Sequence, residues 1–231
     1  MIRDNIITIK GRIEAACARV NRDPGSVAIV AVSKNRTPQE IEEALKAGIT
    51  DIGENRIQEA VLKYSKLRTT DYGLLTIKWH MVGHLQSNKA KEAVKLFDLI
   101  HSVDSVRLAR EIDGQAAKIN KVQDILIEIK TSEEAAKFGI APKDAVETIR
   151  EIARLKNIHI KGLMTIAPLA DNPEKARPYF RALREIRNRI STLYAERCTL
   201  HILSMGMSDD FEVAIEEGAT IVRIGRAIFE E

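Results

Sequence analysis

Residues Val27–Val32 read VAIVAV, an unbroken apolar run that is followed directly by Ser33 and Lys34. A strand with one solvent-facing side alternates apolar and polar residues, whereas a strand buried on both faces is apolar throughout. A shorter run of the same kind, ILI, lies at Ile125–Ile127. These runs predict strands of a parallel sheet whose two faces are both covered, as helices cover them in α/β folds.

Outward from this run, short β-rich segments alternate with helix-length segments, which is the rhythm of repeated β–α units. Eight such segments can be identified, and eight parallel strands are the number that closes a (β/α) TIM barrel. An open doubly wound sheet is the alternative, because periodicity alone does not distinguish a closed sheet from an open one. The predicted strands are Val27–Ser33, Thr50–Gly53, Ile77–Gly83, Leu96–Ser102, Asp124–Lys130, His159–Ile166, Thr199–Met205 and Thr220–Gly225.

The clearest helical patterns lie near the N-terminus. An apolar stripe at helical spacing runs through residues 1–22 and predicts an extra helix that plugs or flanks the barrel. Thr37 and Pro38 predict the start of another helix, because Thr is a good N-cap and Pro loses no hydrogen bond at the first helical position. Gly48 predicts the end of that helix. The stripe consists of Ile2, Ile6, Ile9, Ile13 and Ala16.

The composition excludes several functional classes. The 36 basic and 33 acidic residues leave a formal charge of +3, too small to indicate a nucleic-acid or membrane partner. The five Phe, four Tyr and one Trp are too few for base-stacking platforms. No apolar run approaches the roughly 18 residues of a membrane-spanning helix, and the N-terminus lacks the features of a secretory signal. We expect one cytoplasmic domain over residues 1–231, and a monomer.

The cysteines and histidines do not predict a metal site. Cys17 and Cys198 lack metal-ligand spacing and are expected to pack as small apolar residues, without a disulfide. His80 and His84 are four residues apart, but they flank a predicted strand end, where such residues do not converge. His80 is therefore interpreted as a core or pocket histidine.

The loops that follow the strands build the site of a (β/α) barrel. Lys34 comes directly after the first apolar run, where lost hydration lowers the basicity of an amine, as a Schiff-base lysine requires. The simpler interpretation is a solvated lysine that opens a loop. Lys89 and Lys137 are rival lysines, but Lys89 falls inside a predicted helix and Lys137 in a charged loop.

Two glycine-containing turns follow the last two predicted strands. Leu203–Ser208 reads LSMGMS, and Val222–Arg226 reads VRIGR. Glycine lets backbone N–H groups approach an anion, serine can donate a further hydrogen bond, and these two loops are the usual phosphate site of the barrel. Together with Lys34, the turns predict a phosphorylated carbonyl ligand. The methionines at strand ends suit packing around a flat ligand and equally suit ordinary core filling: Met164, Met205 and Met207.

Six short motifs occur in order along nearly the whole chain. They are Ala31–Lys34 (AVSK), Gly53–Glu59 (GENRIQE), Trp79–Lys89 (WHMVGHLQSNK), Gly162–Met164 (GLM), Leu203–Asp210 (LSMGMSDD) and Arg223–Gly225 (RIG). This set resembles the pyridoxal 5′-phosphate homeostasis proteins, the YggS/PROSC family. The resemblance implies a fold-type III barrel, similar to the N-terminal domain of alanine racemases, that binds pyridoxal 5′-phosphate (PLP).

The resemblance also implies roles for particular residues. PLP would be joined to Lys34 as an internal aldimine, and Asn55 would line the cofactor. Ser204 and the Gly225 turn would hold the phosphate, while Arg223 would face the pyridine nitrogen. No catalytic residue and no metal ligand is expected. The candidate cofactor-binding set is Lys34, Asn55, Ser204, Met205, Gly206, Arg223, Gly225 and Arg226.

Two positions depart from the family pattern. Arg226 stands where a Thr usually follows the Arg-Ile-Gly turn, so a guanidinium contact to phosphate would replace a hydroxyl contact. Arg56 stands where an aromatic residue is common, and it adds positive charge near the mouth of the site.

An arginine at the pyridine nitrogen disfavours a second positive charge on the ring, which makes PLP a weaker electron sink. The racemases resembled here take a second base from an added β-domain, whereas only Arg226–Glu231 follow Gly225 in this sequence. We therefore expect a PLP carrier without turnover, which delivers PLP to apo-enzymes or sequesters it. The alternatives are a PLP-dependent racemase or lyase, and a phosphosugar barrel enzyme in which Lys34 forms a Schiff base with substrate.

Overall fold

The β-rich segments form eight parallel strands, and the computed structural model closes them into a barrel in sequence order. It describes residues 1–67, 77–132, 134, 138–193 and 200–230. The first and last strands pair, with Ala28 opposite Ile221 and Ala31 opposite Ile224, which excludes the open doubly wound sheet. The strands are β1 (Ala28–Val32), β2 (Asp51–Glu54), β3 (Lys78–Met81), β4 (Leu99–Val103), β5 (Gln123–Glu128), β6 (Ile158–Met164), β7 (Ile202–Ser204) and β8 (Ile221–Ile224).

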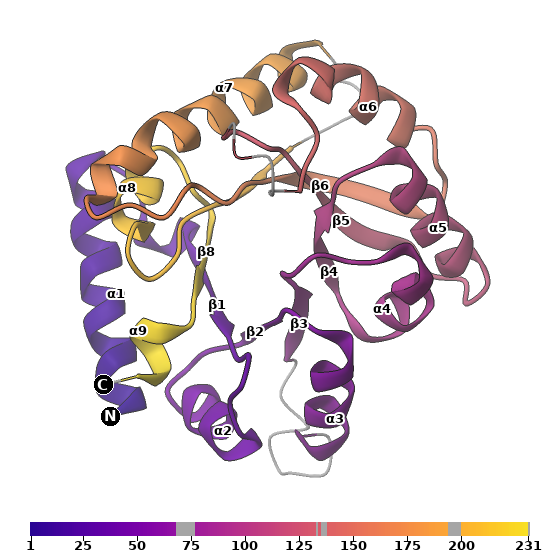
Figure 1. Cartoon of the computed structure of the whole chain (residues 1–231). Coiled ribbons are helices and arrows are strands. Elements are labelled where there is room, and N and C mark those ends of the chain that lie inside the picture. The colour runs from indigo at the N-terminus through magenta and orange to yellow at the C-terminus, as the bar shows by residue number, and fades with distance from the viewer. Residues whose placement is uncertain (68–76, 133, 135–137, 194–199, 231) are drawn as a thin grey trace.

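Helices surround this barrel, and Figure 1 shows them as an outer ring. Their apolar faces and the outward faces of the strands form the larger core, in which Ile52, Ile100 and Val222 are fully buried. The helices are α1 (Ile2–Arg19), α2 (Pro38–Lys46), α3 (Ile57–Leu67), α4 (Ala90–Leu96), α5 (Val106–Ala117), α6 (Ala145–Ile152), α7 (Arg177–Leu193), α8 (Phe211–Glu216) and α9 (Arg226–Phe229).

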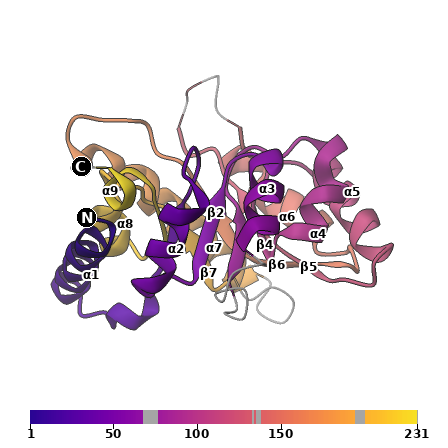
Figure 2. The same cartoon turned by 90° about the horizontal axis from the view of Figure 1, so that it is seen from below.

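The extra N-terminal helix flanks the barrel and does not plug it. Helix α1 packs against α8, α9 and α2, and Figure 2 shows it on the outside of that group. All five residues of the predicted stripe, Ile2, Ile6, Ile9, Ile13 and Ala16, are buried. The helix ends at Arg19, before the predicted limit, because the chain turns through a left-handed Asn21 (φ 53°).

Helix α2 begins where the sequence predicts. The Thr37 hydroxyl accepts a hydrogen bond from the Glu40 N–H at 3.3 Å, and the Glu40 carboxylate accepts one from the Thr37 N–H at 2.7 Å. This reciprocal capping box satisfies two N–H groups that the first helical turn would leave unpaired. Gly48 follows the helix with a positive φ of 88°, a conformation that glycine adopts without strain.

The barrel interior combines an apolar cluster with polar side chains near the carboxyl ends of the strands. The apolar cluster consists of Val30, Leu99, Leu126, Met164 and Ile221. The alternation of side chains along each strand places Glu128 and Arg223 inside the barrel, two residues beyond Leu126 and Ile221. Ser204 likewise lies two residues beyond Ile202, which packs against the cluster. Because these positions lie toward the carboxyl ends of the strands, the polar layer forms the floor beneath the loops that carry the site.

Three further features concern the cysteines, clusters of metal-binding residues and membrane-spanning helices. Cys17 is buried, as expected for a small apolar residue, whereas Cys198 lies outside the described residues. The described ranges hold no cluster of three or more His, Cys, Asp or Glu residues that could bind a metal ion. No helix within those ranges is long and apolar enough to cross a membrane.

Candidate functional site

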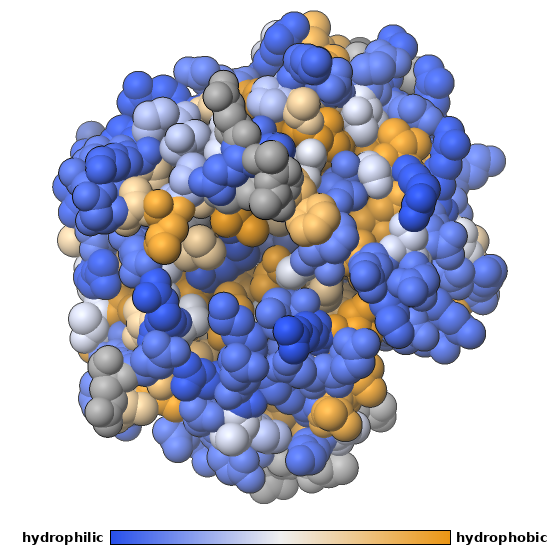
Figure 3. Space-filling model, in the orientation of Figure 1, coloured by the Kyte–Doolittle hydropathy of each residue, from blue (hydrophilic) through white to orange (hydrophobic). Residues whose placement is uncertain are grey.

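A pocket of about 320 Å³ opens among the loops after β1, β2, β3, β6, β7 and β8. It brings together five residues that the sequence predicts for the site: Lys34, Asn55, Arg223, Gly225 and Arg226. Val32, Val82, Ile166, Leu169, Met207, Ser208 and Asp209 complete its wall. Figure 3 shows the molecule hollowed in this region, with polar and apolar residues around the hollow. The predicted lysine and arginine therefore share one cavity with the two glycine-containing turns.

Lys34 lies two residues beyond the end of β1, and its side chain is exposed. The sequence predicted that this amine would lose hydration, but an exposed side chain stays in contact with water. The rival lysines lie elsewhere: Lys89 lines a neighbouring groove with Arg56 and Gln86, and Lys137 lies outside the described residues. Among the described lysines, Lys34 is the one that lines the pocket.

A buried ion pair supports the backbone just before Lys34. The Lys63 ammonium on α3 lies 2.7 Å from Glu54 Oε1 and donates to the Ser33 carbonyl at 2.5 Å. The Ser33 hydroxyl also donates to the Glu54 carboxylate. Burial raises the pKa of Glu54, although Lys63 and Ser33 oppose that rise. The network fixes the residues that precede both Lys34 and Asn55, and sequence reasoning missed it.

Asn55 carries an unpaired acceptor at the pocket. Its side-chain Oδ1 is buried and accepts no hydrogen bond from the described residues. The loop that carries it lies against Gly83, where a Cβ atom would stand 2.4 Å from the Asn55 carbonyl oxygen. Glycine at 83 therefore permits the close approach that places Asn55. A buried acceptor without a donor is costly, so this oxygen suits a ligand that donates to it.

Arg223 lies at the pocket floor, in β8, and is buried. Its Nη1 donates to Ser204 Oγ at 2.6 Å and its Nη2 donates to the Thr165 carbonyl at 2.9 Å. Burial lowers the pKa of Arg223 to about 10, although the carboxylates of Glu128 and Asp210 oppose that shift. The guanidinium is therefore still a cation and a hydrogen-bond donor at neutral pH.

The structure departs from the sequence prediction at three residues of the β7 turn. Ser204 is fully buried inside the barrel, and its hydroxyl is already bonded to Arg223 and His101. Met205 packs in the larger core, and Gly206 adopts a positive φ of 91° that lets α8 approach closely. None of the three lines the pocket, because β7 ends at Ser204 and the chain first reaches the pocket at Met207, followed by Ser208 and Asp209.

The loops after β7 and β8 are joined at the pocket. Arg226 forms an ion pair with Asp209, and the Ser208 hydroxyl accepts a hydrogen bond from the Ala227 N–H at 3.2 Å. The Arg226 guanidinium therefore already has an acidic partner. Gly225 approaches β1, because a Cβ atom there would stand 3.2 Å from the Val32 carbonyl oxygen.

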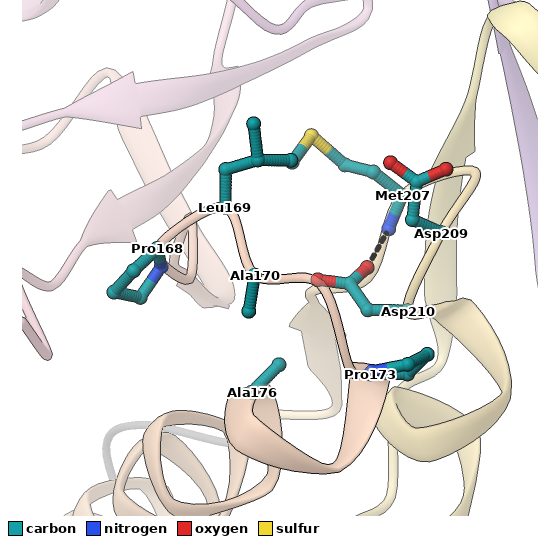
Figure 4. Close-up of a pocket in the computed structure, with 8 residues that line it drawn as sticks. All are labelled: Pro168, Leu169, Ala170, Pro173, Ala176, Met207, Asp209 and Asp210. Carbon is teal, nitrogen blue, oxygen red and sulfur yellow. Dashed lines mark hydrogen bonds between the residues drawn. The ribbon is translucent and has the colours of Figure 1, made fainter.

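A small apolar cleft lies beside the pocket, between the β6 loop and the β7 turn. Figure 4 shows Leu169 and Met207 directed toward one another, and Asp210 bonded back to the backbone of Met207. That bond, from the Met207 N–H to Asp210 Oδ1, measures 2.6 Å. Asp210, at the N-cap position of α8, thus secures the turn before that helix. Leu169 is 86% exposed, so this rim is open to solvent.

Residues 8–231 match the protein family described as "Alanine racemase, N-terminal domain". A "Pyridoxal phosphate homeostasis protein" of Aquifex aeolicus is 45% identical over 220 residues, which are 95% of this chain and 93% of that protein. The protein of the same name from Escherichia coli K12 is 35% identical over 228 residues, 99% of this chain and 95% of that protein.

Two solved structures have a fold similar to that of this chain. PipY of Synechococcus elongatus, determined with PLP bound, has a TM-score of 0.86 and 34% identity, and the match covers 99% of this chain and all of PipY (100%). An alanine racemase of Clostridium difficile has a TM-score of 0.76 at 14% identity, and the match covers 98% of this chain and 58% of that enzyme. The second likeness concerns the fold alone.

Proposed function

The chain belongs to the pyridoxal phosphate homeostasis protein family, within the wider alanine racemase N-terminal domain family, and on this premise we propose that it binds PLP and controls its free supply in the cytoplasm. One observation carries the proposal: a single pocket holds an accessible lysine amine, a buried guanidinium and two loops suited to phosphate. Those three features match the aldehyde, the pyridine nitrogen and the phosphate of PLP.

The residues present suit this cofactor. Lys34 is the proposed covalent anchor, through a Schiff base with the aldehyde. Asn55 offers a buried acceptor that no donor in the described part of the chain reaches, and Arg223 offers N–H groups to the ring nitrogen. The phosphate would take the backbone N–H groups of the Gly225 turn and the Ser208 hydroxyl. Ser208 replaces Ser204 in this role, because the Ser204 hydroxyl is already occupied inside the barrel.

The proposed role is carriage without turnover. A protonated Arg223 disfavours a positive ring nitrogen, and this weakens the withdrawal of electrons on which amino-acid chemistry depends. The pocket rim is open at Leu169, so a free amine or a recipient protein can reach the anchored aldehyde. Apo-enzymes that require PLP are the proposed recipients, and the carrier is proposed to act as a monomer.

Covalent trapping tests the anchor. The protein is mixed with PLP, reduced with borohydride, digested and analysed by mass spectrometry. We expect the reduced pyridoxyl group on Lys34, no trapped band in Lys34→Ala, and an unchanged band in Lys89→Ala, which removes the rival lysine of the neighbouring groove. A pyridoxyl group on any other lysine, or none at all, would overturn the assignment.

A second experiment separates a carrier from an enzyme. The PLP-loaded protein is incubated in heavy water with L- and D-amino acids, and α-proton exchange is followed by NMR against free PLP. We expect exchange no faster than the free cofactor, together with recovery of activity when the loaded protein is given to an apo PLP-enzyme. Exchange orders of magnitude faster, and lost in Lys34→Ala, would identify a racemase or lyase instead.

A further inference from the structure

A continuous chain of hydrogen bonds crosses the barrel interior, from Arg223 beneath the pocket to Asp51 at the opposite end. The Arg223 Nη1 to Ser204 Oγ distance is 2.6 Å, and Ser204 Oγ lies 2.9 Å from His101 Nδ1. His101 Nε2 lies 2.9 Å from His80 Nδ1, and His80 Nε2 lies 3.0 Å from Asp51 Oδ1. Asp51 is the first residue of β2, whose other end leads to Asn55 at the pocket.

The two ends of this chain carry opposite charges. Arg223 is the cation. Burial favours the neutral form of Asp51, but the hydrogen bonds from His80 and Thr50 outweigh that effect and the pKa of Asp51 is lowered. Asp51 is therefore a carboxylate, which accepts hydrogen bonds and donates none. The cationic end can only donate and the anionic end can only accept, which fixes the first and the last hydrogen bond of the chain.

Two imidazole rings lie between these ends, and that of His101 is uncharged. His101 is fully buried, and burial, together with the nearby His80 and Arg223, holds its pKa well below the usual range. A neutral imidazole has one N–H donor and one acceptor nitrogen. In the direction that leaves the Ser204 hydroxyl proton paired, His80 Nε2–H donates to Asp51, His101 Nε2–H donates to His80 Nδ1, and the Ser204 hydroxyl donates to His101 Nδ1.

The only hydroxyl proton of Ser204 is thus committed to His101, so its oxygen faces Arg223 purely as an acceptor. We propose that Ser204, His101 and His80 are positioning residues, which form a one-way relay that holds Arg223 as a donor toward the pyridine ring. The Thr165 carbonyl fixes the other arm of the guanidinium at 2.9 Å. The role toward the ring rests on the proposed binding of PLP, whereas the direction of the relay does not.

The reverse direction has a specific cost. His101 Nδ1–H would then donate to Ser204, and His80 would have to be an imidazolium to donate at both nitrogens, to His101 and to Asp51. The Ser204 hydroxyl proton would also lose its acceptor, because His101 and Arg223 are the hydrogen-bond partners of that oxygen among the described residues. A buried donor left unpaired costs about 1–3 kcal/mol.

NMR of the ligand-free protein tests the direction. With ¹⁵N-labelled histidine at pH 8, long-range spectra distinguish the two ring nitrogens. From the hydrogen-bond directions we expect the ring proton on Nε2, and none on Nδ1, in both His80 and His101. A proton on Nδ1 of His101, or an imidazolium at His80, would overturn the relay. This measurement involves neither PLP nor a variant.

Spectra of the PLP-bound protein test the positioning role, with two serine variants as a matched pair. Ser204→Ala removes the acceptor for Arg223. Ser102→Ala removes a buried hydroxyl, beside His101 on β4, that has no hydrogen-bond partner among the residues the structure describes. We expect Ser204→Ala to shift the absorbance maximum of bound PLP and to weaken binding about fivefold, the loss of one hydrogen bond. Ser102→Ala should change neither quantity.

The outcomes separate the two proposals. If Ser204→Ala melts and absorbs as the wild type does, with equal affinity, Ser204 does not position Arg223 and the positioning role falls, while PLP binding stands. If the wild type binds no PLP, the proposed function fails together with the positioning role, and the histidine spectra alone decide whether the relay exists.

Discussion

Lys63 is a buried cation whose ammonium joins the Glu54 carboxylate to the Ser33 carbonyl. Removing one partner of such a pair leaves the other charge buried and uncompensated, at a cost of about 3–5 kcal/mol. We expect Lys63→Met to lower the free energy of unfolding by roughly that amount, measured by urea denaturation. Lys66→Met, at an exposed position of the same helix, should stay near the wild type.

A double variant identifies the cause of this loss. Glu54→Gln combined with Lys63→Met removes both charges, so part of the lost stability should return. Equal losses in the single and the double variant would show that the buried charge of Glu54 is not what destabilises Lys63→Met, and the ion-pair account would be wrong.

Glu128 is a nearly buried carboxyl group inside the barrel. Burial and the nearby Asp104 raise its pKa from 4.5 to about 7, although Arg223 opposes the shift. The folded state therefore holds the proton more tightly than the unfolded state, so this contribution to stability is present below about pH 4.5 and is lost as the pH rises through about 7.

Glu128→Gln tests this pH dependence, because glutamine stays neutral. Relative to the wild type, the variant should gain roughly 1–3 kcal/mol in the free energy of unfolding at pH 8 and little at pH 5. Urea denaturation at both pH values measures the gain, and Glu147→Gln, at an exposed position of α6, is the control. A gain that is the same at both pH values contradicts the raised pKa.

Among single residues, those next to a strand end were predicted best. Lys34 and Gly225 follow recognisable apolar runs, so their place at the mouth could be predicted from the sequence. Ser204 could not be separated from Ser208, because nothing in LSMGMS marks the residue at which the strand stops. The importance of Lys63 was less clearly indicated by the sequence. It falls on the buried stripe of α3 with Ile57 and Ala60, where a lysine requires a partner.

At the scale of elements, the turn between β7 and α8 depends on Gly206. Its φ is 91°, and a Cβ atom would stand 2.6 Å from the Ala214 Cβ and 2.9 Å from the Phe211 Cα. Gly218, after α8, also has a positive φ of 99°, but there a Cβ atom would meet only side chains, at 3.5 Å and beyond. The two glycines therefore share the backbone strain and differ in the steric clash.

This pair gives a prediction for the turn. Gly218→Ala should cost about 1 kcal/mol, the strain of a positive φ. Gly206→Ala should cost clearly more in urea denaturation and should also weaken PLP binding, because α8 must move away from the turn that carries Met207 and Ser208. Equal costs in the two variants would show that the close approach of α8 is not important for the turn.

Elements with long or strongly marked patterns were predicted closely. The stripe of α1 and the capping residues of α2 repeat over several turns or act locally, so tertiary contacts do not override them. Strand limits were less certain: β7 was predicted over Thr199–Met205 and is only Ile202–Ser204. Apolar residues beyond a short barrel strand also pack in the core, as Met205 does, so hydrophobicity alone cannot locate the end of pairing.

At the scale of the whole molecule, the pocket is formed by residues from both the N-terminal and the C-terminal part of the chain. Its residues follow β1 and β2 as well as β7 and β8, and β1 pairs with β8 to close the barrel. Helix α1 reinforces this junction, because the Asn5 side chain donates to the Ile228 carbonyl at 3.1 Å. The pocket therefore exists only when the barrel is closed, and a ligand that fills it must favour the closed, folded state.

Thermal unfolding tests this coupling. A ligand that binds only the folded state adds about 2.7 kcal/mol at a hundred times its dissociation constant, so the Tm should rise steadily with PLP concentration. Pyridoxal should raise it far less at the same concentration, because it lacks the phosphate and so the charge-assisted hydrogen bonds at Ser208 and Gly225, each worth roughly 1.5–3 kcal/mol. In Lys34→Ala, PLP should keep the phosphate-dependent part of the rise, and inorganic phosphate should compete with it. Equal shifts from PLP and pyridoxal would mean that the turns after β7 and β8 do not hold the phosphate.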